Sequence, residues 1–224
     1  KQEVIGNIRA FRDKPVQYIL ERSPELSTQY YTLINHKGIF KNKKVRQAFS
    51  YAIDRNEIVE QVLQGEGISG MYGIVPPLFD GYDNKKITGY SFDAEKAKKL
   101  LAEAGYPGGK GFPKVTFELN SGGARNVNVA LAVQKQLKKT LNIDLDFNIV
   151  PFPQKIEDEK YARVDMFRAA WAADYPHPEN FLWLLYGKTI PESPDEPSYP
   201  NSPRYLNPKV DALYEKAIAS GTQK

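Results

Sequence analysis

Apolar side chains recur every three or four residues in several segments of the chain, which is the pattern of amphipathic helices. Residues 45–53 form the clearest such segment, and Asp54 with Glu57 resembles a capping box that opens a second helix, ended near residue 65. A third helix is predicted to begin at Asp93, which caps it. Weaker patterns predict helices over residues 3–11, 125–141, 154–161 and 208–218.

Strands are predicted where apolar and polar residues alternate. Residues 115–119 and 143–149 alternate on either side of the helix at 125–141, which is the order of a parallel βαβ unit with half-buried strands. Further strands are predicted over residues 15–20, 29–34 and 164–173. Irregular connections rich in Gly, Pro or Ser are expected at 65–90 and 187–205. This order of elements predicts a single α/β domain, with a mixed sheet and flanking helices.

The composition narrows the classes of protein that fit. A hydrophobic content of 41% in 224 residues is enough for a substantial core. Lys and Arg total 31 against 27 Asp and Glu, and the charges are dispersed, so nucleic-acid binding is not indicated. The absence of cysteine excludes disulfides, thiolate metal sites and a cysteine nucleophile, but it leaves the compartment open. No apolar stretch reaches the roughly 20 residues that span a bilayer, and the first residues do not form a signal peptide. We therefore expect either a cytosolic protein or a targeting segment that lies outside this chain.

Two segments superficially resemble ligand loops and fail on their key residues. The segment Gly105–Gly111 resembles a phosphate-binding loop, yet Ala104 stands where the first glycine is required, so a helix stop and turn explain it better. The segment Asp144–Asn148 resembles the start of a calcium loop, yet Ile149 replaces the obligatory glycine. The solvent face of an alternating strand is the better account of these acidic residues.

Catalytic and metal motifs are also missing. His36 and His177 are the only histidines, they are far apart in the sequence, and neither lies in a triad context. The cluster Lys41–Lys44 has no interleaved aromatic residues and is better explained as a solvated helix entry than as a nucleic-acid site. We therefore predict no catalytic residue, no metal site and no cofactor.

The strongest candidate site lies where the apolar run 164–173 ends. Open α/β sheets bind ligands at strand ends, and Asp174 follows this run with Trp171 and Tyr175 beside it. If the strand continued to Asp174, alternation would place Arg168 and Asp174 on one face, where opposite charges suit a zwitterion, and Trp171 on the other. The simpler alternatives are a turn or helix-capping aspartate, a core tryptophan and an arginine in a surface ion pair.

Four segments together resemble a known family, the extracytoplasmic solute-binding proteins of ABC importers, in their oligopeptide- and dipeptide-binding branch (family 5). In this order and spacing they are far more specific than any single motif. They are Lys44–Val59, Phe92–Tyr106, Trp171–Leu182 and Tyr205–Leu213.

The resemblance implies a lobe of the type II periplasmic-binding-protein kind. Family members are considerably longer, so residues 1–224 are expected to form one ligand-binding lobe of a two-lobed protein, whose other lobe lies outside this chain. In the peptide binders of the family, the aspartate of the Trp-x-x-Asp motif receives the ligand's N-terminal ammonium, which implies this role for Asp174. Arg168 matches an arginine that meets a ligand carboxylate in some members. Trp171 and Tyr175 match positions at or beside the site.

The function implied is non-catalytic capture of peptides between two lobes and their delivery to the membrane subunits of an ABC permease. The location implied is periplasmic or extracytoplasmic with a membrane anchor. Similar family members bind a nickel complex, haem-like ligands or oligosaccharides, so another solute is the alternative, and a peptide hydrolase is a further one, for which no nucleophile is assigned. Peptide length, mode of anchoring and oligomeric state stay open, and we expect the isolated lobe to fold without binding ligand tightly.

Overall fold

A four-stranded sheet forms the centre of the computed structural model, which describes residues 23–79 and 81–220. The strand order is β1-β4-β2-β3, and β2 runs parallel to both β3 and β4, whereas β1 is antiparallel to β4. The strands are β1 (Ser27–Leu33), β2 (Val115–Asn120), β3 (Leu145–Val150) and β4 (Met166–Ala172). The sheet is therefore mixed, as predicted, and the βαβ unit of β2 and β3 is confirmed.

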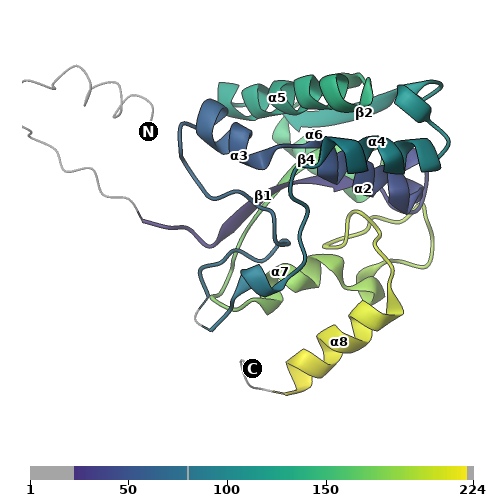
Figure 1. Cartoon of the computed structure of the whole chain (residues 1–224). Coiled ribbons are helices and arrows are strands. Elements are labelled where there is room, and N and C mark those ends of the chain that lie inside the picture. The colour runs from purple at the N-terminus through teal and green to yellow at the C-terminus, as the bar shows by residue number, and fades with distance from the viewer. Residues whose placement is uncertain (1–22, 80, 221–224) are drawn as a thin grey trace, which may run out of the picture.

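Helices cover the sheet on both sides, with α5 above it and α7 and α8 below it in the view of Figure 1. The helices are α2 (Lys43–Ala52), α3 (Arg55–Glu57), α4 (Ala94–Glu103), α5 (Ala124–Leu141), α6 (Phe152–Lys160), α7 (Glu179–Leu182) and α8 (Pro208–Ala219). A π-helical turn at Ile58–Val62 extends α3, and short 3-10 turns lie in the connections. The helix predicted at 3–11 and the strand at 15–20 lie outside the described residues. No helix of the described part has the length and apolar character to cross a membrane.

The main core lies between one face of the sheet and the helices α2, α4 and α5. Val115, Phe117 and Leu119 of β2 are at most 1% exposed and project into it. Apolar residues at helical spacing supply the other side, which is why the periodicity located these helices correctly. Packing of these large side chains holds the sheet against the helices.

The opposite face of β2 is also buried, which corrects the prediction of a half-buried strand. Glu118 is 0% exposed because α6 covers this face, and Thr32 of β1 donates a hydrogen bond of 2.8 Å to the Glu159 carboxylate. Asn148 of β3 donates to Glu118 over 2.8 Å. Charged residues of α6, including Lys155, are themselves buried there. The layer beneath α6 is thus a polar network rather than a second apolar core.

The predicted capping box at the start of α3 is half right. The Asp54 carboxylate accepts hydrogen bonds from the backbone N–H groups of Asn56 and Glu57 at 3.0 and 3.1 Å. The return bond is made by Gln136 of α5 instead, because its amide oxygen accepts from the Asp54 N–H over 2.9 Å and its Nε2 donates to Glu57 over 2.9 Å. A buried side chain from a distant helix therefore joins α3 to α5.

Candidate ligand-binding site

The carboxyl ends of the three parallel strands meet at one edge of the sheet, and β4 continues beyond its neighbour β2 there. Its register with β2 covers only Met166 and Phe167, whereas its register with β1 continues to Ala172. The N–H of Ala173 still donates to the carbonyl of Leu26, the residue before β1, over 2.8 Å. Since successive peptide groups point to opposite sides of a strand, the N–H and C=O of Ala170 and Ala172 point away from β1. Among the described residues, no part of β4 beyond Phe167 is in register with β2, so the second half of β4 has an open edge on that side.

Arg168 lies where this open edge begins. It sits opposite Tyr31 in the sheet, and its guanidinium donates to Gln29 and, over 3.4 Å, to Asn120. No carboxylate of the described residues lies within ion-pair distance, so this part of the chain offers Arg168 no surface ion pair. Burial lowers the pKa of this guanidinium, and nearby Arg125 adds to the effect, because both disfavour a charged group without a counter-ion. The arginine is therefore a half-buried cation that forms no ion pair with the residues described by the structure.

Asp174 lies beyond the other end of the open edge. The strand stops at Ala172, so the alternation argument that placed Asp174 on a face of β4 does not apply. Its backbone N–H donates to the Asn180 side chain over 3.1 Å, while its exposed carboxylate makes no hydrogen bond or ion pair within the described residues. The capping alternative is wrong as well, because Pro178 occupies the N-cap of α7.

Trp171 lies on the face of β4 opposite Arg168 and is half-buried. Its indole Nε1–H donates to the Asn180 Oδ1 over 2.7 Å. Its ring packs against Trp183 and Tyr199, with centroids 6.5 and 6.4 Å apart. The core interpretation of this residue is thus partly right, and its position beside Asp174 follows from their shared contact with Asn180.

The hydroxyl of Tyr175 is hydrogen-bonded within the segment that follows β4. The hydroxyl donates to the Glu179 carboxylate, which also accepts from Tyr214. This bond to Glu179 raises the pKa of Tyr175, because it stabilises the protonated phenol. The ring itself is 47% exposed and offers an apolar surface next to Asp174.

Sequence reasoning missed three side chains of this region, namely Gln29, Asn120 and Asn180. Gln29 is brought to Arg168 only by the pairing of β1 with β4, which no local pattern encodes. Asn120 is the last residue of β2, immediately before a Ser-Gly-Gly loop, and a polar residue at the carboxyl end of a predicted parallel strand was a usable signal. Asn180 lies within the segment Trp171–Leu182 that carries the family resemblance, but the sequence assigns no role to it, because its contacts depend on the fold of the 174–180 loop.

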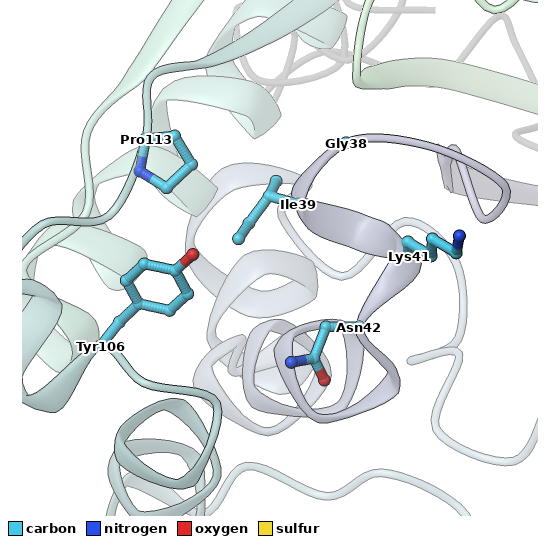
Figure 2. A pocket seen from close by; sticks show the side chains of 6 residues that line it. All are labelled: Gly38, Ile39, Lys41, Asn42, Tyr106 and Pro113. Atoms are coloured by element: carbon cyan, nitrogen blue, oxygen red, sulfur yellow. The ribbon is translucent and has the colours of Figure 1, made fainter.

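A separate hollow of about 560 Å³ lies at the other end of the sheet. It is lined by Gly38, Ile39, Lys41, Asn42, Tyr106 and Pro113 (Figure 2). Pro113 precedes β2 and Gly38 follows the carboxyl end of the antiparallel strand β1, so this hollow faces away from Arg168 and Asp174. In the described residues no group of three His, Asp or Glu side chains is placed to hold a metal ion.

Comparison with known proteins gives a consistent assignment. The family model described as "Bacterial extracellular solute-binding proteins, family 5 Middle" matches residues 4–193. Heme-binding protein A of Haemophilus influenzae is 33% identical over 96% of this chain and 38% of its own length. The periplasmic oligopeptide-binding protein OppA of Salmonella typhimurium is 30% identical over 90% of this chain and 36% of its own length. The chain thus spans less than two fifths of these relatives.

A solved structure agrees with the sequence comparison. The periplasmic binding protein DppA of Helicobacter pylori, in complex with the peptide STSA, superposes with a TM-score of 0.79 at 27% identity, over 94% of this chain and 39% of that one. The motifs at Trp171–Leu182 and at Tyr205–Leu213 lie within one continuous described region, in the order that the resemblance requires. The chain belongs to the bacterial extracellular solute-binding proteins of family 5.

Proposed function

We propose that this chain forms one lobe of an extracytoplasmic solute-binding protein and binds extended peptides along the open edge of β4. The single observation that carries the proposal is the edge of β4 at Ala170 and Ala172, which has no registered strand on the β2 side and lies between a cation at Arg168 and a carboxylate at Asp174. In this assignment the lobe captures peptides and the complete protein delivers them to the membrane subunits of an ABC permease.

Main-chain recognition explains why such an edge suits peptides. An extended peptide adds to an exposed strand through N–H and C=O groups that every residue carries, so affinity does not depend on side-chain identity. Ala170 and Ala172 are exposed and small, so they leave room for the side chains of an added strand. An exposed strand edge promotes aggregation when it has no function. The exposed edge of β4 therefore favours a binding role.

The two charges define the direction of the bound peptide. Asp174 receives the N-terminal ammonium and Arg168 the carboxylate, each in a charge-assisted hydrogen bond. Because Asp174 follows Arg168 along β4, the peptide runs antiparallel to β4. The two residues are six positions apart, which corresponds to about 20 Å along an ideal strand. Arg125, whose carboxylate partner Glu66 lies 3.0 Å away, adds positive potential at the Arg168 end.

The remaining parts of the assignment follow from the relatives. Their names describe binding proteins, and two of them, the periplasmic oligopeptide-binding protein and the periplasmic protein solved with the peptide STSA, support a peptide ligand and an extracytoplasmic location. Trp171 and Tyr175 flank the ammonium site. The other lobe supplies the second wall of the cleft, and for this reason the chain alone lacks half of the enclosing contacts. We assign no catalytic step, because the region contains no activated nucleophile.

A different solute is the second candidate, since one relative at 33% identity is named a heme-binding protein. The carboxylates of such a ligand would occupy Arg168, whereas Asp174 would have no cation to bind. The two candidates therefore differ in their dependence on Asp174.

The test is mass spectrometry of ligands that co-purify with the two-lobed protein, in the wild type and in Asp174→Ala. We expect peptides with free N-termini in the wild type and their loss in the variant. Asp195→Ala, which removes another exposed loop carboxylate, is the matched control and keeps them. Haem or a sugar in the wild type, or peptides retained equally by Asp174→Ala, would overturn the peptide assignment.

A further inference from the structure

Asn180 lies beneath the loop that carries Asp174 and is only 2% exposed. Its Oδ1 accepts two hydrogen bonds, one of 2.7 Å from the Trp171 indole and one of 3.1 Å from the Asp174 backbone N–H. One buried acceptor thus joins a residue of the strand to a residue of the loop.

We propose that Asn180 is the positioning residue of the ammonium site, holding Asp174 and Trp171 in a fixed relation at the end of the open edge of β4. The proposal rests on the function proposed for Asp174 and names the side chain that makes this function possible. Asn180 itself touches no ligand, and it acts through the two groups that it binds.

The local backbone leaves Asp174 without another support. The last bond to the sheet is made by Ala173, and the next turn bond runs from the His177 N–H to the Tyr175 carbonyl over 2.8 Å. Between these two bonds the Asp174 N–H has only Asn180 as its partner. The Asp174 carboxylate has no partner among the described residues, so its direction is set by the backbone that Asn180 holds.

The chemistry of the asparagine side chain suits this role. A carbonyl oxygen has two lone pairs and accepts from two donors at once, without bringing a charge next to the Asp174 carboxylate. The Asn180 side chain also lowers the pKa of Tyr175 against the increase that Glu179 causes, which places it within reach of a third residue of the region. The buried position excludes water as a substitute for the amide oxygen.

The first experiment measures binding to the two-lobed protein. The probes are a mixed library of tri- to pentapeptides and the same library after N-acetylation, and the readout is the preference for free N-termini. Asn180→Leu, which keeps the size and removes the acceptor, should reduce this preference about tenfold and leave the binding of acetylated peptides unchanged, because a displaced carboxylate no longer meets the ammonium. Asn180→Asp keeps the acceptor but adds a negative charge near Asp174, so it should retain more of the preference than Asn180→Leu and less than the wild type.

The second experiment needs no ligand and uses this chain. The chain has two tryptophans, so its NMR spectrum contains two indole signals, and Trp171→Phe identifies the one that belongs to Trp171. Slow solvent exchange of the Trp171 indole and of the Asp174 amide is expected in the wild type and in Asn180→Asp. Both should exchange faster in Asn180→Leu, while amides of β2 stay protected and report that the sheet is intact.

The outcomes separate this inference from the function on which it rests. An unchanged Asp174 amide in Asn180→Leu overturns the positioning role, as does a full preference for free N-termini in that variant. Equal losses for free and acetylated peptides would show a general structural role instead and also overturn it. If Asp174→Ala itself keeps the preference, the proposed ammonium site fails, and the exchange data still decide whether Asn180 holds the loop. If Asn180→Leu does not fold, Asn180→Asp decides in its place, with Trp171→Phe again identifying the indole signal. Fast exchange of the Asp174 amide in Asn180→Asp would then overturn the positioning role.

Discussion

The buried carboxyl of Glu118 should make the stability of this chain depend on pH between about 4.5 and 7. Glu118 lies at 0% exposure between the sheet and α6, and its Oε1 has no hydrogen-bond partner in the described residues. Burial, followed by the negative charge of Asp158, raises its pKa from 4.5 to about 7. Lys155 and the hydrogen bond from Asn148 act in the opposite direction, without cancelling the effect of burial.

Three charged residues of α6 are buried in the same layer, and Arg163 follows the helix; these four groups fix the local charge. Lys155 forms an ion pair with Glu159, and Asp158 forms one of 2.6 Å with Arg163. The lysine is therefore already neutralised by its neighbour on the helix. Glu118 has no cation of its own, and this explains why its neutral form is favoured in the fold.

The magnitude follows from the difference in proton binding between the folded and unfolded chain. The unfolded chain releases the Glu118 proton near pH 4.5 and the folded chain releases it only near pH 7, so stability is highest at low pH and falls as the pH rises through this window. A pKa of about 7 instead of 4.5 corresponds to about 3 kcal/mol of lost stability once the group is ionised. Glu118→Gln keeps the size and the acceptor for Asn148 but cannot ionise.

Urea unfolding at a series of pH values from 4.5 to 8 measures this difference. The free energies of unfolding of wild type and Glu118→Gln should be similar at pH 4.5, and the variant should be more stable by up to about 3 kcal/mol at pH 8. Glu60→Gln, at an exposed position, should follow the wild type throughout. Parallel profiles for wild type and Glu118→Gln would refute the argument that this carboxyl is held neutral by burial.

Arg168→Gln should weaken binding of peptides with a free C-terminus by about tenfold in the two-lobed protein and leave C-terminally amidated peptides unaffected, as measured by calorimetry, because one charge-assisted bond is lost. Lys110→Gln, at an exposed position distant from the site in the sequence, is the matched control, and an equal loss for both peptide forms would contradict the assignment of Arg168. Gln136→Leu should lower the free energy of unfolding by about 1–3 kcal/mol, since the Asp54 N–H and the Glu57 carboxylate lose their partner. A urea midpoint equal to that of the wild type would show that water replaces this side chain.

Local patterns predicted most of the fold because helices and strands of this chain carry their own signals. The Asp93 carboxylate caps α4 through the Lys96 N–H over 2.9 Å, as predicted from the sequence, and Asn207 caps α8. The burial of Glu118 was not predicted, because a charged residue in an alternating strand normally marks a solvent face. Glu118 is covered by α6, which comes later in the sequence than β2. Gln136 was missed for the same reason, since its partners are 79 and 82 residues away.

The candidate site was predictable in composition but not in geometry. The motif around Trp171 and Asp174 identified the two residues, whereas the alternation argument failed because β4 ends at Ala172. The strand direction is then no guide to the Asp174 side chain, and the loop is held by Asn180 instead. A hydrogen bond between a loop backbone and a side chain six residues later has no periodic signature, so sequence analysis could not supply it.

The length of β2 determines what β4 is able to bind. β2 ends at Asn120, where a Ser-Gly-Gly loop turns the chain into α5, and this leaves the second half of β4 without a neighbour on that side. If the proposed function is right, this half of β4 contacts only the backbone of a ligand, because Ala170 and Ala172 have no side chain beyond a methyl group. Charge is present only at the two ends, at Arg168 and Asp174. Selectivity should therefore be strict for the ligand's termini and weak for its side chains, and any finer discrimination must come from the lobe that closes over this edge.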